Sequence, residues 1–457
     1  IILIHSGIAT GKTRNIAKIA NDLKKASDCN ILSVVNLVSL ATEQMHTFKV
    51  EGNVELLDYR KKLKSFYQND GVICINSLHK LSNVNKNSCN KENGCDFKNT
   101  ILYIDECNDL IQTITQNATL ELRPVYDKLK QLIKSCKKII LSDATINQNT
   151  INLLMSRTEN KKIIHIKNKF KKYNGVPAMR YKDENEFLKK LDDCIKNDKY
   201  FLFGCDSCRK LTTIFNDLVQ KNELKKSSFV LITSETGYRP QDASKEFKDK
   251  FVFYSPSITT SVSFVFKDVK QAQFIYMTNN PLITPASFYQ MSCRTRNMSE
   301  LNYYSDDPKP REMKIKTLEE IETKNKSLTD AHEKILSLSR STDEFDNDKI
   351  VCNSFFKMYC YREYEDSIFW TGYLQHYQDF LTKSGFVLES IGELKKLNKI
   401  KSVEMKGDYI EFREAQFTDY IEHYENGDVG EGSEMTDGIN KMLRWISFQF
   451  MIKEEVC

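Results

Sequence analysis

The amino-acid sequence predicts an α/β protein in which two parallel-sheet lobes stand in tandem and a mostly helical C-terminal domain follows. Two observations carry this prediction. Short apolar runs alternate with helical segments through about the first 300 of the 457 residues, and a basic, polar stretch interrupts this alternation once. The runs are continuously apolar, which is typical of strands buried on both faces of a parallel sheet.

The first lobe is predicted over residues 1–167. Its strands are expected at five apolar runs, which are residues 1–5, 30–36, 71–77, 100–106 and 137–143. Helical patterns separate these runs, as expected when each parallel strand is followed by a helical crossover to the next.

A linker is expected at the basic stretch 167–177, and the second lobe is predicted over residues 177–306. The strands of this lobe are expected at residues 199–205, 228–234, 251–257, 273–279 and 300–305. Beyond it, long helical patterns predict the C-terminal domain, residues 310–457. Aromatic residues crowd positions 355–380, where we expect most of them in a core and base stacking is the alternative.

Composition sets limits on the partners. The formal net charge is +5, from 67 basic and 62 acidic residues, which permits nucleic-acid binding without arguing for it. Thirteen cysteines in no regular framework favour reduced thiols in an intracellular protein. No apolar run approaches the roughly 20 residues that span a bilayer, so we expect a soluble protein with no membrane partner. The chain begins inside its first predicted strand without a methionine, which favours a fragment of a longer polypeptide.

The stretch SGIATGKT, residues 6–13, follows the first predicted strand and opens a helix. It matches the phosphate-binding pattern G-x-x-x-x-G-K-[ST] except at its first position, where serine replaces glycine. In such a loop, Lys12 would neutralise the β- and γ-phosphates of ATP and the Thr13 hydroxyl would ligate Mg²⁺. The predicted cofactor-binding residues are Ser6, Gly7, Thr10, Gly11, Lys12 and Thr13. The alternative is a glycine turn that only precedes a helix.

An acidic pair ends the strand predicted at 100–106. Asp105 and Glu106 lie at its carboxyl end, where ligands bind in open α/β sheets. Asp105 is predicted to hold Mg²⁺, and Glu106 to orient or deprotonate an attacking water. Acidic pairs at strand ends also serve as solvated caps, but the phosphate loop upstream favours the metal-binding interpretation.

A third stretch, LSDAT at 141–145, ends the next predicted strand. With the three stretches in this order, the chain resembles the superfamily 2 helicases and translocases, whose motif III is S-A-T; here Asp143 is inserted. The resemblance implies two RecA-like lobes with ATP between them. It extends to motif V at 255–264 and to motif VI at 290–297, and it implies that Gln290 and an arginine from the second lobe meet the γ-phosphate.

Two arginines compete for that role. The second arginine of motif VI usually stands three residues after the first, and Asn297 occupies that position here. Arg296 precedes it by one residue, so the sequence favours Arg296 and keeps Arg294 as its close rival. A structural salt bridge is the competing interpretation of the pair.

Four stretches, 72–81, 231–240, 255–264 and 287–297, resemble more closely the origin-of-replication-binding helicases of herpesviruses and their relatives in large DNA viruses. This resemblance spans roughly residues 1–306. It implies single- or double-stranded DNA as a partner, replication proteins such as a primase or a single-strand-binding protein, and a location in the nucleus or at a cytoplasmic viral replication site. Residues implied to grip the nucleic-acid backbone, each with capping or turn formation as the alternative, are Ser39, Ser77, His79, Thr233, Ser234, Thr259 and Thr260.

The hypothesis from the sequence is therefore an ATP hydrolase, a DNA helicase or translocase of superfamily 2 that acts in replication. Closure of the lobes on ATP would shift the grip of one lobe along a strand. A small-molecule kinase with a phosphate loop explains Lys12 and Asp105 but leaves the second lobe unexplained. A nucleic-acid-binding protein with a degenerate, inactive motor is favoured by Ser6, by the displaced arginine and by Ser261, where motif V often has glycine.

Overall fold

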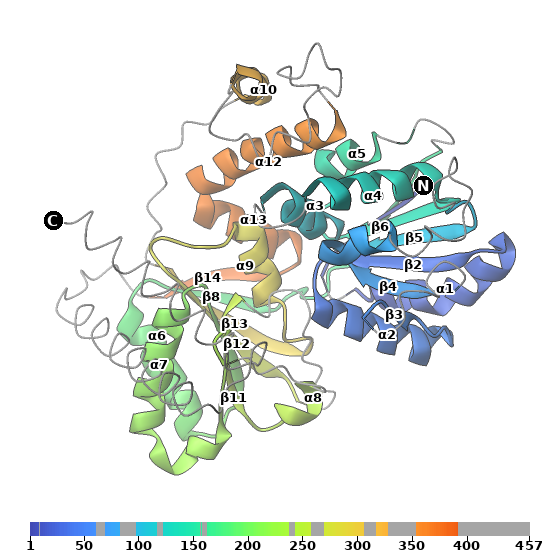
Figure 1. The fold of residues 1–457 in the computed structure, drawn as a ribbon. Helices are drawn as coiled ribbons and strands as arrows, with labels where there is room; N and C mark the ends of the chain where they lie inside the picture. Colours follow the sequence, from blue (N-terminus) through green and yellow to red (C-terminus); the bar gives the residue numbers. More distant parts are fainter. Residues whose placement is uncertain are drawn as a thin grey trace, which may run out of the picture.

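The computed structural model describes residues 1–8, 10–60, 69–82, 97–116, 122–155, 157, 162–236, 243–256, 269–305, 317–327 and 353–391. Within these residues the chain forms two seven-stranded sheets, one after the other along the sequence (Figure 1). Neighbouring strands in both sheets run parallel, as the continuous apolar runs predict. The two RecA-like lobes in tandem are thereby confirmed.

The strands of lobe 1 lie in the order β3-β4-β2-β5-β6-β1-β7. Their bounds are β1 (Ile2–Ser6), β2 (Asn30–Val35), β3 (Leu57–Asp58), β4 (Gly71–Cys74), β5 (Thr100–Asp105), β6 (Lys138–Asp143) and β7 (Ile164–Asn168). All five predicted runs form strands, although the run at 71–77 turns into the 3₁₀ helix η2 (Ile75–Ser82) halfway along.

Helices cover both faces of the lobe 1 sheet (Figure 1). On one face, α1 (Lys12–Ser27) packs beside α2 (Val38–Gly52). On the other face lie α3 (Cys107–Gln116), α4 (Leu122–Ser135) and α5 (Gln148–Leu154). The strand residues between these layers are almost wholly buried; Ile101, Leu102, Tyr103 and Ile104 of β5 are examples. The order brings β5, β6 and β1 side by side, so their carboxyl ends meet at one edge.

The sheet of lobe 2 has the strand order β10-β11-β9-β12-β13-β8-β14. Its strands are β8 (Pro177–Tyr181), β9 (Phe201–Cys205), β10 (Phe229–Ile232), β11 (Phe251–Tyr254), β12 (Gln271–Met277), β13 (Met298–Ser305) and β14 (Val387–Ile391). Its helices are α6 (Glu184–Lys196), α7 (Cys208–Lys221), α8 (Ala243–Glu246) and α9 (Pro285–Ser292), with the 3₁₀ helix η3 (Glu223–Ser228). Phenylalanines dominate one of its cores, where Phe187, Phe201 and Phe253 are fully buried.

The described part of the C-terminal region packs on both lobes. Helices α10 (Leu318–Ser327) and α12 (Ser354–Thr371) join the core of lobe 1 through residues such as Phe355 and Tyr359. After Gly372, α13 (Tyr373–Lys383) joins a core of lobe 2 through Tyr377 and Leu381. Strand β14 then extends the lobe 2 sheet beside β8. Many of the crowded aromatic side chains are therefore core residues, as we expected.

None of the helices in the described ranges combines the length and the apolar character needed to cross a membrane.

Candidate nucleotide-binding site between the lobes

The phosphate loop connects the end of β1 to the start of α1. Gly11 precedes the helix with φ of 80°, a left-handed conformation that suits glycine. Ser6, which replaces the first glycine of the pattern, is 3% exposed and its hydroxyl lies 2.6 Å from that of Thr10. Asn168 at the end of β7 donates a hydrogen bond to the same Ser6 hydroxyl at 2.9 Å. The Ser6 hydroxyl therefore links Thr10 within the loop to Asn168 at the end of β7.

Lys12 lies across the phosphate loop. Its ammonium donates to the carbonyl oxygens of Ser6 and Gly7, at 3.1 and 3.4 Å, and lies 3.9 Å from the Glu106 carboxylate. Only 7% of the Lys12 side chain is exposed. The Lys12 ammonium thus lies at the loop that leads into the N-terminus of α1. A cation at a helix N-terminus is suited to bind phosphate.

Asp105 lies at the end of β5 and accepts hydrogen bonds from several directions. The hydroxyls of Thr13 and Ser142 each approach it to 2.5 Å, and the Gln44 amide lies 3.4 Å away. Thr13 and Asp105 are the two residues predicted to hold Mg²⁺, and the structure brings their oxygens together. One carboxylate and one hydroxyl suit Mg²⁺, which usually keeps several waters and binds phosphate oxygens as well. Gln44 is a contact that the sequence analysis missed, since no motif marks it.

Glu106 follows Asp105 in a left-handed backbone conformation, with φ of 49°, an unusual value for a residue other than glycine. Burial raises the pKa of its carboxyl to about 8; Lys12 opposes that shift and the neighbouring Asp143 adds to it. Among the described residues its Oε2 atom is buried with no hydrogen-bond partner. A carboxyl group that titrates near neutral pH and has a free buried oxygen is suited to take a proton from water.

Asp143, the residue inserted in motif III, joins the ends of β5 and β6. Its carboxylate accepts the backbone N–H of Asn108 at 2.8 Å and the backbone N–H and hydroxyl of Thr145 at 2.8 and 2.9 Å. Asn108 is the second residue of α3, so Asp143 satisfies a free N–H at the start of that helix. Asn108 also donates to the Thr145 carbonyl oxygen. The insertion therefore fixes the loop after β6 to the helix that follows the acidic pair.

Gln290 reaches from lobe 2 to lobe 1. It lies on α9, and its side-chain amide donates to the Asp109 carboxylate at 3.5 Å. Burial raises the pKa of Asp109 to about 7, whereas the positive charge of Arg294 and the bond from Gln290 act in the opposite direction. Two residues of motif VI therefore act on a carboxyl group that lies three residues after Glu106.

Arg294 is 5% exposed, and charged groups of both lobes influence its guanidinium. Burial lowers the pKa of its guanidinium and nearby Arg296 lowers it further, while Glu106 and Glu43 of lobe 1 raise it. Its Nε atom is buried and has no hydrogen-bond partner in the part of the chain that the structure describes. The Arg294 charge therefore lies within electrostatic reach of the acids of lobe 1.

Arg296 is half-buried and donates to the Cys293 carbonyl oxygen at 3.4 Å. It also acts on lobe 1: the protein around the carboxyl of Glu43, a solvent-exposed residue of α2, raises the pKa of that group, and the charges of Arg296 and Arg294 lower it. Both arginines thus lie within electrostatic reach of lobe 1, and Arg294 acts on Glu106 and Asp109 as well.

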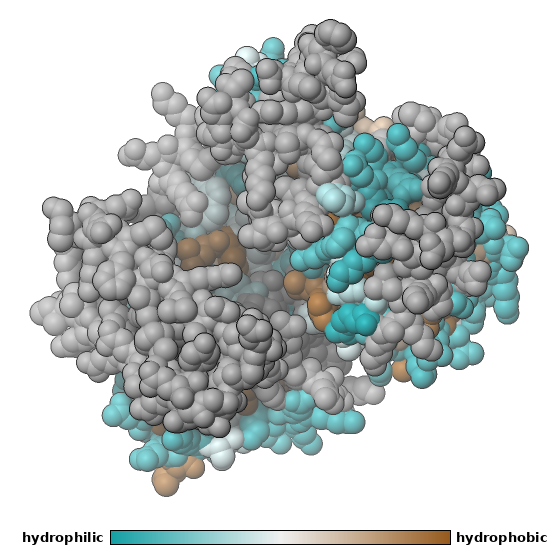
Figure 2. Space-filling model, viewed as in Figure 1, coloured by the Kyte–Doolittle hydropathy of each residue, from teal (hydrophilic) through white to brown (hydrophobic). Residues whose placement is uncertain are grey.

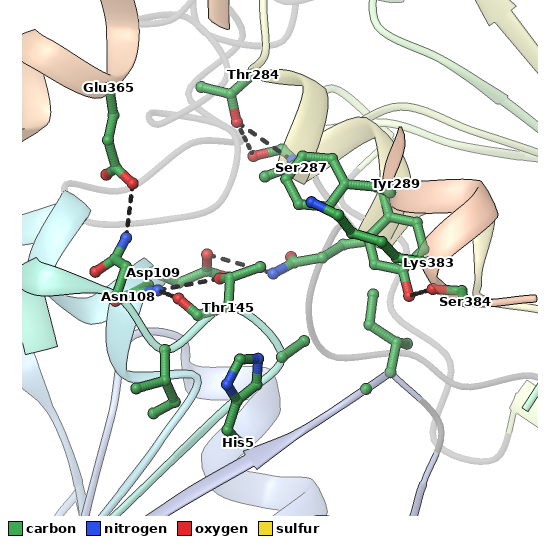
Figure 3. A pocket seen from close by; sticks show the side chains of 18 of the residues that line it. His5, Asn108, Asp109, Thr145, Thr284, Ser287, Tyr289, Glu365, Lys383 and Ser384 are labelled. Carbon is green, nitrogen blue, oxygen red and sulfur yellow. Dashed lines mark hydrogen bonds between the residues drawn. The ribbon is translucent and has the colours of Figure 1, made fainter. Parts of the chain in front are cut away.

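A cavity of about 820 Å³ lies between the lobes (Figure 3). Its lining comes from both lobes, the linker and the C-terminal helices, and includes Asp109, Thr145, Tyr289, Glu365 and Lys383. Gly7 of the phosphate loop and Gln290 also line it, whereas Lys12 and Asp105 do not. Figure 2 shows the molecule hollowed between the two lobes on the face in view. The cavity therefore borders the phosphate loop and α9, whereas Glu106 and Arg294 also lie outside its lining.

The residues predicted to grip nucleic acid are scattered over both lobes. Ser39 is the second residue of α2, and Ser77 and His79 lie in η2; all three are half-buried. Thr233 is buried, and its hydroxyl accepts the backbone N–H groups of Glu235 and Thr236, both at 3.2 Å, so it forms a turn. Ser234 is exposed. Thr259 and Thr260 lie outside the described residues.

Comparison with known proteins gives one family match. A family model described as an origin of replication binding protein matches residues 1–265. No curated protein matches the chain.

Similar solved structures include three helicases. Dbp5 of S. cerevisiae bound to RNA and ADP BeF3 has a TM-score of 0.48 at 11% identity, covering 67% of this chain and 79% of that chain. Mss116p bound to ssRNA and AMP-PNP has a TM-score of 0.47 at 13% identity, covering 85% of this chain and 88% of that chain. The Mycobacterium smegmatis helicase Lhr bound to ssDNA and AMP-PNP has a TM-score of 0.47 at 11% identity; this chain is covered over 67% and spans 44% of Lhr. Because these TM-scores lie below 0.5, the fold assignment rests on the sheet topology and on the family match.

Proposed function

Because the chain belongs to the family of origin of replication binding proteins, whose fold is that of the superfamily 2 helicases, we propose that it is a DNA-dependent ATPase that translocates along or unwinds DNA in replication. The observation that carries this proposal is the contact between the lobes, where the Gln290 amide donates to the Asp109 carboxylate at 3.5 Å and the charge of Arg294 lowers the pKa of the same carboxyl. A motor of this type needs a cation from one lobe to complete a phosphate site on the other.

Lys12, Thr13 and Asp105 are proposed to hold the triphosphate and its Mg²⁺. Lys12 would neutralise the β- and γ-phosphates, while the Thr13 hydroxyl and the Asp105 carboxylate, 2.5 Å apart, would ligate the metal. When bound, Mg²⁺ neutralises the charge that develops on the phosphate oxygens. Ser6, Gly7, Thr10 and Gly11 complete the loop. The buried, unpartnered atoms of Glu106 and Arg294 among the described residues support a ligand between them.

Glu106 is proposed to orient and deprotonate the attacking water. Its raised pKa makes it a stronger base than an ordinary carboxylate, and Lys12 lies 3.9 Å from it to stabilise the charged form. Gln290 is proposed to act beside it, because its amide already reaches Asp109 across the cleft.

Arg294 is proposed as the arginine that stabilises the transition state. The sequence favoured Arg296, because the spacing in motif VI points one position later. The charge of Arg294 acts on both Glu106 and Asp109, whereas Arg296 is half-buried and donates to a carbonyl of its own lobe. This placement supports the earlier arginine of the pair.

The lobes are proposed to span residues 1–167 and 177–306, with a C-terminal domain over 310–457. ATP binding would draw the lobes together, and hydrolysis would release them. Single- or double-stranded DNA is the proposed partner, gripped by residues such as Ser39, Ser77 and His79. A primase or a single-strand-binding protein, and a nuclear or cytoplasmic site of viral replication, follow from the family alone.

ATP hydrolysis with and without single-stranded DNA tests the proposal. We expect wild-type turnover that DNA stimulates, and loss of that turnover in Lys12→Ala. Lys18→Ala is a matched control, because it removes an exposed lysine from the same helix. Turnover that survives Lys12→Ala would overturn the site. Nucleotide binding without turnover in the wild type would support the inactive-motor alternative, and phosphate transfer to a small acceptor would support a kinase.

A further inference from the structure

Three buried tyrosines contact the arginine segment, residues 291–296, two through its backbone and one through the Ser292 side chain. The Tyr254 hydroxyl donates to the Met291 carbonyl oxygen at 2.7 Å. The Tyr377 and Ser292 hydroxyls share a hydrogen bond of 2.8 Å. The Tyr173 hydroxyl donates to the carbonyl oxygens of Cys293 and Thr295, the residues on either side of Arg294, at 2.9 and 3.2 Å.

The three tyrosines come from three separate parts of the chain. Tyr254 is the last residue of β11, Tyr173 belongs to the linker between the lobes, and Tyr377 lies on α13, which packs beside α9 (Figure 1). They are 0%, 2% and 0% exposed, respectively. Because a buried phenol must find a hydrogen-bond partner, each of these rings is committed to the arginine segment.

The arginine segment depends on these bonds because it begins where α9 ends. The last carbonyl groups of a helix have no partner within it, and here the hydroxyls of Tyr254 and Tyr173 satisfy two in this region. Gln273 reinforces the arrangement: it donates to the Tyr254 hydroxyl at 3.1 Å and accepts from Thr295 at 2.9 Å. Burial raises the pKa of all three phenols, which keeps them protonated and able to donate.

Arg294 is buried, with an exposed fraction of 5%. Its Nε atom is buried and has no hydrogen-bond partner among the residues that the structure describes. The backbone sets the point from which the guanidinium extends. The hydroxyls of Tyr254 and Tyr173 bond to that backbone, and the Tyr377 hydroxyl bonds to the Ser292 side chain beside it.

We propose that Tyr173, Tyr254 and Tyr377 are positioning residues that hold Arg294 toward the acids of lobe 1, which makes the linker and α13 parts of the ATP-hydrolysing machinery. This inference rests on the proposed function. It gives the C-terminal helix a role in catalysis, although it lies beyond the residues that the family model matches.

Removal of single hydroxyls tests the inference. In Tyr173→Phe, Tyr254→Phe and Tyr377→Phe, we expect kcat for ATP to fall about three- to tenfold, the factor that one neutral hydrogen bond contributes, with KM within about twofold of wild type. Tyr303→Phe is the matched control. Tyr303 is equally buried and its hydroxyl accepts a hydrogen bond from Gln378 of α13, but among the described residues it forms no hydrogen bond with the arginine segment. Its kcat should stay near the wild-type value.

A second kinetic measurement separates positioning from a general structural effect. In an Arg294→Ala background, Tyr377→Phe should cause no further loss of kcat, because its effect passes through the missing guanidinium. A loss of the same size in both backgrounds would overturn the inference.

Hydrogen–deuterium exchange tests the positioning without reference to activity. We expect faster exchange of the backbone amides at 291–297 in the three variants than in wild type and Tyr303→Phe. Unchanged exchange in all three would refute the inference. If the wild type does not hydrolyse ATP, the proposed function fails, while the exchange measurement still decides whether the tyrosines hold this segment.

Discussion

Replacement of Asp143 by alanine is expected to destabilise lobe 1 more than most single substitutions. The Asp143 side chain is fully buried and its carboxylate accepts three hydrogen bonds of 2.8 to 2.9 Å, one from Asn108 and two from Thr145. Each bond to a charged, buried acceptor contributes about 1.5 kcal/mol or more. The loss is partly offset, because Asp143 also repels Glu106 and Asp109. A net decrease of about 3–5 kcal/mol in the free energy of unfolding is therefore expected.

Urea denaturation measures this change in the unfolding free energy. Asp127→Ala is the control, since Asp127 is exposed on α4 and forms an ion pair with Lys130 at 3.4 Å. Its effect should stay within about 0.5 kcal/mol. A decrease below about 1 kcal/mol in Asp143→Ala would refute the reasoning that this carboxylate holds the loop after β6 to the start of α3.

Two further predictions concern the phosphate site. The pKa of Glu106 is raised to about 8, so a base at this position is lost as pH falls, and kcat/KM for ATP should decrease about tenfold from its high-pH plateau to pH 7. Glu106→Gln should abolish the turnover. A flat profile between pH 6 and 9 would contradict this role. Ser6→Ala removes the hydroxyl that meets Thr10 and Asn168, so we expect KM for ATP to rise about fivefold, since the loop loses bonds on both sides. An unchanged KM in a titration of ATP turnover would show that the loop keeps its shape without the serine.

The sequence was sufficient for the features that depend on local pattern. Strands β2 and β5 were predictable because they are continuous apolar runs, and parallel strands buried on both faces have that character. The phosphate loop and the acidic pair were predictable because each needs particular residue types at fixed positions after a strand.

Other elements have no such local pattern. Strand β7 was not predicted, because all five of its residues are exposed and its sequence, IHIKN, is not a continuous apolar run. Strand β14 was not predicted either; it pairs with β8 across about 200 residues of sequence, and only the folded chain brings them together. These strands lie at the sheet edges, where burial is weakest.

The sequence predicted many residues of the candidate site, but it did not predict which of them bond to one another. Asp143 was visible as an insertion in motif III, but its bonds to Asn108 and Thr145 depend on the register of β5 and β6. Gln44 approaches Asp105 from α2, and no spacing rule connects those positions. The choice between the two arginines depends on the segment at the end of α9, which three tyrosines from distant parts of the sequence contact.

The measurement that tests the account most directly compares ATP turnover in Arg294→Ala and Arg296→Ala under saturating ATP and single-stranded DNA. The arginine that completes a phosphate site from another lobe contributes a factor of about 10³ or more to kcat. We predict a loss of that size in Arg294→Ala and a loss below about tenfold in Arg296→Ala, whose side chain donates within its own lobe. Turnover near the wild-type rate in Arg294→Ala would contradict the claim that the two lobes build one site for ATP hydrolysis.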